Sequence, residues 1–233
     1  EVVGHRSWVS HGGASATASR WYGLGPPVGV PSASGPARRP TRHAMIRPEV
    51  DVPLPIESER LLIRRFEMRD VPGIVKLSSN PTVDEAAPEL GATPEAAASY
   101  VDRQQALQPF QPDALFDLAI TRRSDGALLG MLTLINRGAT GELGYALHSD
   151  HRGEGFGTEA AAALVAFAFA ELGMTRVTAE TAVTNQPSRR VMERLGMQLE
   201  ETRPDRDGVE AFVYGIDRDD WESEVDGDTD GDG

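Results

Sequence analysis

The sequence predicts a mixed α/β (α+β) domain over residues 53–220, with a central sheet flanked by helices. Short apolar runs that favour strands alternate along this stretch with longer runs that favour helices. A glycine-rich turn also joins one strand, 143–147, directly to an alanine-rich helix, 160–170. In chain order the runs predict the elements β-α-α-β-β-β-α-β-α-β, which is compatible with a mixed sheet.

A strand and two helices open the predicted domain. The strand, 61–66, is followed by Asp70, which can cap a helix whose apolar stripe ends before Pro81. The second helix begins at Thr93-Pro94-Glu95, where Thr is a favourable N-cap, Pro fits the first helical position and an acid follows. We expect this second helix to run through Leu107.

Three strands follow the two helices. The first two, 115–121 and 128–135, are separated by the turn Ser124-Asp125-Gly126 and predict a hairpin. The third, 143–147, leads into the glycine-rich turn. The remaining predicted elements are a strand at 176–182, a helix at 189–195 and a strand at 209–216.

The turn after strand 143–147 has the composition of an anion-binding loop. Glycines at 153, 155 and 157 let the backbone approach a ligand closely and adopt positive φ values. The first N–H groups of the following helix have no partner within it and lie at the positive end of the helix macrodipole. This arrangement suits a phosphate or pyrophosphate. The glycine spacing differs from the dinucleotide fingerprint, and no P-loop Gly-Lys-Ser/Thr follows.

The composition excludes several classes of site. The chain has no cysteine, which excludes disulfides, a thiolate zinc site and a thiol nucleophile, and we expect no metal. No apolar run reaches membrane-spanning length, so we expect a cytoplasmic protein without membrane association. The net charge of −13 disfavours nucleic acid as a partner. Lys76 is the only lysine, which fits a halophilic organism, although a GC-rich genome would also favour arginine.

Both ends of the chain are expected to be disordered. Residues 1–44 are rich in Gly, Ser, Pro and Ala, carry five arginines against one acid and show no apolar period. They also lack the continuous apolar core of a secretory signal. Because position 1 is Glu and Met45 is the first methionine, our hypothesis is that Met45 is the true start. An acidic tail, 221–233, follows the domain.

Several strings resemble the GNAT acyltransferases, and they fall along the chain in the order and at spacings compatible with that family. Arg152-x-x-Gly155-x-Gly157, with Thr158-Glu159-Ala160 behind it, is similar to the acetyl-CoA loop of that family. The other strings resemble its branch of ribosomal-protein alanine and serine N-acetyltransferases. They are 58–64 (SERLLIR), 125–130 (DGALLG), 142–145 (ELGY) and 185–197 (NQPSRRVMERLGM). The resemblance covers roughly residues 53–220 and implies the GNAT fold, in which two neighbouring strands splay apart.

The resemblance implies an acetyl-CoA site around the gap between the splayed strands. Backbone groups of Tyr145, Ala146 and Leu147 would pair with the pantetheine arm. Asn185 would meet the pantetheine from the end of the next strand, and it is also a plausible turn residue ahead of Pro187. The pyrophosphate would be held by Arg152, Gly153, Glu154, Gly155, Phe156, Gly157 and Thr158.

The resemblance also implies direct attack of an amine on the acetyl thioester, which requires a base and an acid. Glu142 and Glu180 are the candidate bases, with a slight preference for Glu142, whose pKa would rise on burial in the cleft. The alternative for each of them is a solvated carboxylate at the end of a strand, without a catalytic role. Many members place a tyrosine acid seven residues after the family asparagine, but Met192 stands there. Ser188 is then the candidate acid, or simply a residue of the first helical turn.

The implied function is acetyl-CoA-dependent N-acetylation of a primary amine, with the Ala or Ser amine of a protein N-terminus as the first choice of acceptor. Small-molecule amines, such as amino acids, polyamines or antibiotics, are alternative acceptors, because a fold does not fix its substrate. A non-catalytic acyl-CoA sensor is a further alternative. Dimers are common in this branch, although no feature of the sequence requires a homodimer.

Overall fold

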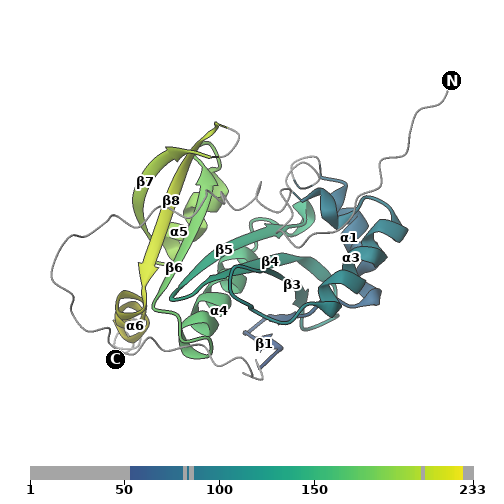
Figure 1. Ribbon diagram of the computed structural model, residues 1–233, viewed down its shortest axis with the longest axis horizontal. Helices are drawn as coiled ribbons and strands as arrows, with labels where there is room; N and C mark the ends of the chain where they lie inside the picture. The colour runs from purple at the N-terminus through teal and green to yellow at the C-terminus, as the bar shows by residue number, and fades with distance from the viewer. Residues whose placement is uncertain (1–52, 81–82, 84–86, 206–207, 228–233) are drawn as a thin grey trace.

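A computed structural model of the protein describes residues 53–80, 83, 87–205 and 208–227. The extension 1–44 and the proposed start at Met45 lie outside the described residues. Within these residues, eight strands form one sheet in the order β1-β2-β3-β4-β5-β6-β8-β7. Neighbouring strands pair antiparallel, apart from the parallel pair of β5 and β6. The predicted mixed sheet with flanking helices is confirmed (Figure 1).

The elements lie close to the predicted positions. The strands are β1 (Ile56–Glu57), β2 (Leu61–Arg64), β3 (Leu115–Arg122), β4 (Leu128–Arg137), β5 (Thr140–Leu147), β6 (Arg176–Ala182), β7 (Gln198–Pro204) and β8 (Glu210–Asp217). The helices are α1 (Val71–Ser78), α3 (Pro94–Ala106), α4 (Phe156–Ala170), α5 (Gln186–Arg194) and α6 (Arg218–Gly227). Short 3-10 turns are η2 (Met68–Asp70), η3 (Pro88–Leu90) and η4 (Ser149–His151).

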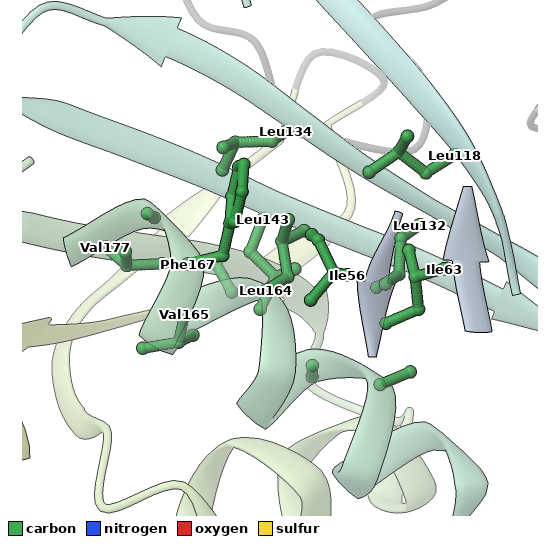
Figure 2. Packing of buried hydrophobic residues seen from close by; sticks show 14 of the residues in the cluster. Ile56, Ile63, Leu118, Leu132, Leu134, Leu143, Leu164, Val165, Phe167 and Val177 are labelled. Carbon is green, nitrogen blue, oxygen red and sulfur yellow. The ribbon is translucent and has the colours of Figure 1, made fainter. Parts of the chain in front are cut away.

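Helix α4 covers one face of the sheet and forms the larger apolar core with it. Leu164 and Phe167 of α4 pack among strand residues that include Leu134, Leu143 and Val177 (Figure 2). Each of these side chains is nearly or completely removed from water. Burial of this apolar surface, at about 25 cal/mol per Å², is what holds the alanine-rich helix against the strands.

Helices α1 and α3 lie on the opposite face around a smaller core. The rings of Phe66 and Tyr100 meet edge to face with centroids 5.4 Å apart. The guanidinium of Arg65 donates to three carbonyl oxygens at the end of α3, at 2.7 to 2.9 Å. The last carbonyls of a helix lack partners in its hydrogen-bond ladder, and although the N–H of Leu107 donates to the Gln104 carbonyl at 3.3 Å, Arg65 supplies further donors at this C-terminus.

A buried polar network joins α3 to the sheet on this same face. The carboxylate of Asp117 on β3 accepts the Tyr100 hydroxyl at 2.8 Å and the Gln104 side-chain amide at 3.1 Å. The Thr133 hydroxyl on β4 donates to its other oxygen. Burial raises the pKa of Asp117 to about 6, although the hydrogen bonds from Thr133 and Tyr100 oppose the rise.

The two predicted helix caps have different outcomes. Thr93 accepts the N–H of Ala96 at 3.3 Å, which confirms the predicted cap of α3. Asp70 precedes α1 as expected, but its side chain does not cap the helix, so that prediction is wrong. Its carboxylate instead accepts hydrogen bonds from both terminal nitrogens of Arg64, at 2.7 and 2.9 Å, and from the backbone N–H of Glu67 at 2.8 Å. A buried guanidinium needs a charged partner more than an exposed helix end needs a cap.

The C-terminal segment includes a helix that the sequence analysis did not predict. Helix α6 occupies part of the tail that we expected to be disordered over 221–233, and residues 228–233 lie outside the described part of the chain. The Trp221 ring packs 6.4 Å from the ring of Phe169, centroid to centroid. Arg218 donates to the carbonyl of Phe169 at 2.6 Å and to that of Met174. These contacts tie α6 to the end of α4.

Candidate functional site

The site begins where β5 and β6 part. Their parallel register runs only from the pair Thr140 and Arg176 to the pair Leu143 and Ala179. Both strands continue beyond it, β5 to Leu147 and β6 to Ala182, and Figure 1 shows them diverging. Residues 144–147 therefore face a gap in place of a paired strand. Backbone N–H and C=O groups demand hydrogen-bond partners, so this edge can pair with an extended ligand.

The three residues predicted to bind pantetheine lie in this diverging segment. Ala146 is buried against the core beneath α1 and α3, whereas Leu147 and Tyr145 pack with the core beneath α4. Their side chains are thus committed to packing on both faces of the sheet. This packing is compatible with the predicted contact of their backbone groups with pantetheine, which stays a prediction.

The glycine-rich loop has the geometry of an anion cradle. Gly153 and Gly155 have φ values of +82° and +84°, a region that favours glycine. Gly155 is the N-cap of α4, and no side chain caps that helix. The N–H groups of its first turn are therefore available to a phosphate. Gly157 lies so close to β5 that a Cβ there would be 3.3 Å from Leu147 and 3.4 Å from the ring of Tyr145.

The other predicted loop residues surround these glycines. Phe156 is buried, Thr158 is half-buried, and Arg152 and Glu154 are exposed. Arg152 lies near enough to Tyr145 for its charge to act on the pKa of that hydroxyl. The structure thus brings the predicted loop beside the diverging end of β5.

The start of α5 borders the gap from the other side. Asn185 is its N-cap, and the side-chain oxygen accepts the N–H of Ser188 at 3.2 Å. The Ser188 hydroxyl lies 3.5 Å from the Tyr145 hydroxyl. Burial raises the pKa of Tyr145, so this phenol keeps its proton at neutral pH. Sequence reasoning assigned only backbone groups to Tyr145 and missed this contact. Met192, where many members carry tyrosine, is buried.

Both candidate bases lie on the face of the sheet opposite α4. Side chains alternate along a strand, and Leu143 packs with the α4 core while Ala146 packs with the other core. Glu142 is four positions before Ala146 on β5, so its side chain points to the same face as that of Ala146. On β6, Ala179 joins the α4 core, so Glu180 faces the opposite side with Glu142.

Each candidate base is paired with an arginine. Arg137 donates to one oxygen of Glu142 at 3.2 Å, and the other oxygen, Oε2, is buried without a hydrogen-bond partner. Arg203 donates to Glu180 at 2.7 Å. Burial raises the pKa of Glu180, the charge of Arg203 opposes that rise, and the negative charge of Glu142 adds to it. The two carboxylates on neighbouring strands are therefore close enough to affect one another.

An open cleft of about 390 Å³ lies beside the end of β5. It is lined by Lys76, Leu77, Ser79, Asn80, His148 and Ser149. His148 is buried with its Nε2 3.0 Å from the carbonyl oxygen of Gly73, and burial lowers its pKa. Lys76 pairs with Asp150 at 2.6 Å. The cleft thus lies between the end of α1 and the segment that follows β5. Neither Glu142 nor Glu180 lines it.

The described ranges contain neither a metal-binding cluster nor a membrane-spanning helix. No group of three or more His, Asp or Glu side chains there is arranged to hold a metal ion. No helix in those ranges combines the length and the apolar character needed to cross a membrane.

Comparison with known proteins gives consistent matches. A family model for the acetyltransferase (GNAT) domain matches residues 60–198. The uncharacterized N-acetyltransferase YnaD of Bacillus subtilis (strain 168) is 29% identical over 147 residues, which are 62% of this chain and 83% of YnaD. The putative ribosomal N-acetyltransferase YdaF of the same strain is 38% identical over 112 residues, 43% of this chain and 59% of YdaF. A GNAT-family acetyltransferase structure from Bacillus anthracis has a TM-score of 0.61 at 26% identity, over 71% of this chain and 99% of that one.

Proposed function

Because the chain belongs to the GNAT acetyltransferase family, we propose that it acetylates the amine of protein N-termini that begin with Ala or Ser. Acetyl-CoA is the acetyl donor of this family. The acceptor is supported by the strings that resemble the ribosomal-protein branch and by the similarity to YdaF, a putative ribosomal N-acetyltransferase. Small-molecule amines are the competing acceptors, and a thiol-release assay with both classes of amine distinguishes them.

One observation carries the acetyl-CoA part of the proposal. Beyond Leu143, β5 has no strand partner on its β6 side, and this free edge lies beside the start of α4, which no side chain caps. In the proposal, residues 152–158 hold the pyrophosphate, and the backbone of residues 145–147 pairs with the pantetheine arm next to Asn185. Bound there, acetyl-CoA supplies the thioester whose acetyl group is transferred.

Glu142 is the proposed base. As the C–N bond forms, the attacking amine must lose a proton to a nearby acceptor. The buried Oε2 of Glu142 has no hydrogen-bond partner, whereas Arg137 holds the other oxygen in place. An unpaired buried oxygen is costly, and an amine N–H would satisfy it. Glu180 is the second candidate, because it lies on the same face and burial raises its pKa toward neutrality.

Ser188 is the proposed donor to the leaving thiolate when the C–S bond breaks. It stands in the first turn of α5, and its N–H is already fixed by Asn185. Tyr145, whose hydroxyl lies 3.5 Å away, can return a proton to it. This pair of hydroxyls would serve the role of the tyrosine that Met192 replaces.

The test is isothermal titration of the full chain with acetyl-CoA, followed by thiol release with a panel of amines. The panel contains peptides that begin with Ala or Ser, amino acids, polyamines and aminoglycosides. We expect binding, and turnover fastest with the peptides. Turnover confined to small amines would overturn the acceptor. Binding without any turnover would favour an acyl-CoA sensor, and absence of binding in a folded sample would overturn the proposal.

Two glutamine variants identify the base. For Glu142→Gln we expect kcat to fall about 10²- to 10⁴-fold with the Kd for acetyl-CoA unchanged, because only proton removal is lost. Glu201→Gln is the matched control, since Glu201 is an exposed carboxylate that also lies near Arg203. If Glu180→Gln shows the larger loss, Glu180 is the base. In that case kcat/KM of the wild type should rise with pH through its raised pKa, because only the deprotonated form accepts a proton.

A further inference from the structure

Arg60 is bound to the glycine-rich loop although it lies 94 residues earlier in the chain than Glu154. It stands immediately before β2, and its Nη1 donates to the carbonyl oxygen of Glu154 at 3.0 Å. Its guanidinium lies 4.5 Å from the ring centroid of Phe156. Its Nη2 is 3.3 Å from the position that a Cβ on Gly155 would take. One side chain thus contacts Glu154 and Phe156 and lies beside Gly155 between them.

Glu159, in the first turn of α4, holds Arg60 in this position. Its carboxylate accepts the Arg60 backbone N–H, the Arg60 Nε and the Ser58 hydroxyl, each at 2.7 Å. Partial burial acts to raise the pKa of Glu159, but these donors and the charge of Arg60 bring it below its usual value. The carboxylate is therefore ionised at neutral pH, and its charge is favourable at a helix N-terminus.

The contact with Glu154 determines which way the loop backbone points. A peptide unit is planar and trans, so the carbonyl of Glu154 and the N–H of Gly155 point in opposite directions. Because the carbonyl is directed at Arg60, the Gly155 N–H is directed away from Arg60. The guanidinium also lies over Phe156, the first residue of α4, so the turn and the helix start are fixed together.

We propose that Arg60 is a positioning residue that orients the loop N–H groups for the pyrophosphate of acetyl-CoA. This inference rests on the proposed acetyl-CoA site. Arg60 contacts the loop on the side of the Glu154 carbonyl, opposite the Gly155 N–H, and needs no contact with the cofactor. The competing explanation is a purely structural one, in which Arg60 only fastens the β1–β2 turn to α4. The two explanations differ in one respect: only the positioning role makes the loss of affinity on mutation of Arg60 depend on the pyrophosphate of the donor.

The test compares two acetyl donors in the Arg60→Ala variant of the full chain. Acetyl-CoA carries the pyrophosphate, and S-acetyl-pantetheine lacks it. We expect the Kd for CoA by titration and the KM for acetyl-CoA to rise roughly tenfold, which corresponds to about 1.4 kcal/mol. The value of kcat and the activity with S-acetyl-pantetheine should change less than twofold. An equal loss with both donors, or no change in the Kd for CoA, would overturn the proposal.

Arg123→Ala is the matched control. Arg123 is an exposed arginine just after β3 that contacts the same β1–β2 turn, where it donates to the Ser58 carbonyl at 2.8 Å and pairs with Glu57 at 3.4 Å. No contact between Arg123 and residues 153–159 is among its described interactions. We expect its Kd for CoA to equal that of the wild type, and a rise matching that of Arg60→Ala would support the structural explanation.

A conservative variant keeps the test decisive if Arg60→Ala does not fold. Arg60→Lys retains the charge but loses the forked geometry that reaches Glu154 and Glu159 together. We expect a smaller rise in the Kd for CoA, about threefold, and a Kd equal to that of the wild type would count against the proposal. Failure of the wild type to bind CoA would overturn the proposed function and this inference together. Binding by the wild type with unchanged Kd in both Arg60 variants would overturn this inference alone.

Discussion

The two faces of the sheet are closed by different chemistry. Beneath α4 the contacts are apolar, made by side chains such as Leu164 and Phe167 against the strands. Beneath α1 and α3 the packing also includes two buried polar groups, the pair of Arg64 with Asp70 and the network around Asp117. Apolar burial is non-directional, whereas each buried polar atom requires a partner in one position.

This difference bears on the proposed site, because Glu142 and Glu180 face the polar side. The orientation of α1 and α3 over the sheet is set by hydrogen bonds that tolerate little displacement. On the α4 face, in contrast, apolar packing along the helix holds α4 in place, with Gly157 at its start packed against the end of β5. Three variants test whether the face beneath α1 and α3, the polar face, depends on its buried hydrogen bonds and charge pair as much as this comparison implies.

The largest effect is expected from Arg64→Ala. Asp70 would then keep a buried carboxylate without its cation, and removal of one member of a buried pair costs about 3–5 kcal/mol of unfolding free energy. Urea unfolding measures the loss. The control is Arg69→Ala, because Arg69 forms an exposed pair with Glu67 at 2.8 Å and such pairs contribute about 0–1 kcal/mol. Equal losses in the two variants would show that the polar face gains nothing from its buried charge pair.

The second prediction concerns the pH dependence that Asp117 gives to stability. Its pKa is about 6 in the folded protein and near 3.9 in an unfolded chain. Between these values the unfolded state has released the proton while the folded state retains it. The unfolded state therefore binds fewer protons, so stability falls as pH rises from about 4 to about 6, by at most about 3 kcal/mol, and is constant above.

Asp117→Asn removes this titration. We expect the unfolding free energy of the wild type, relative to that of Asp117→Asn, to decline across this pH window in urea unfolding series. Ile120→Val on the α4 face is the control, since loss of one buried methylene costs about 1 kcal/mol independently of pH. A flat difference between wild type and Asp117→Asn would mean that Asp117 titrates normally in the folded protein.

The same comparison explains which parts of the molecule could be predicted from sequence. The strand, the glycine turn and the alanine-rich start of α4 carry local signals, since positive φ and helix propensity depend on the residues themselves. The cap at Thr93 is local as well. The family resemblance added the divergence of β5 and β6, which no local pattern reveals.

The missed features all depend on contacts that form only once the chain is folded. Asp70 has the composition of a cap, but Arg64 competes for its carboxylate once both are buried. Strand β7 is almost entirely exposed and has no apolar alternation, so only its pairing with β8 defines it. The contact of Arg60 with the loop likewise requires the β1–β2 turn to lie beside α4, and these segments are almost 100 residues apart in the chain.

The smallest effect is expected at the start of α3. Thr93→Ala removes one hydrogen bond to the N–H of Ala96 at an exposed position, which typically costs about 1 kcal/mol. Pro94 still favours the first helical turn, so Tyr100 and Gln104 farther along α3 should keep their bonds to Asp117. Thr93→Ser, which retains the hydroxyl, should stay within about 0.5 kcal/mol of the wild type in urea unfolding. A loss near that of Arg64→Ala would mean that the polar face depends on the first turn of α3 as much as on its buried charges.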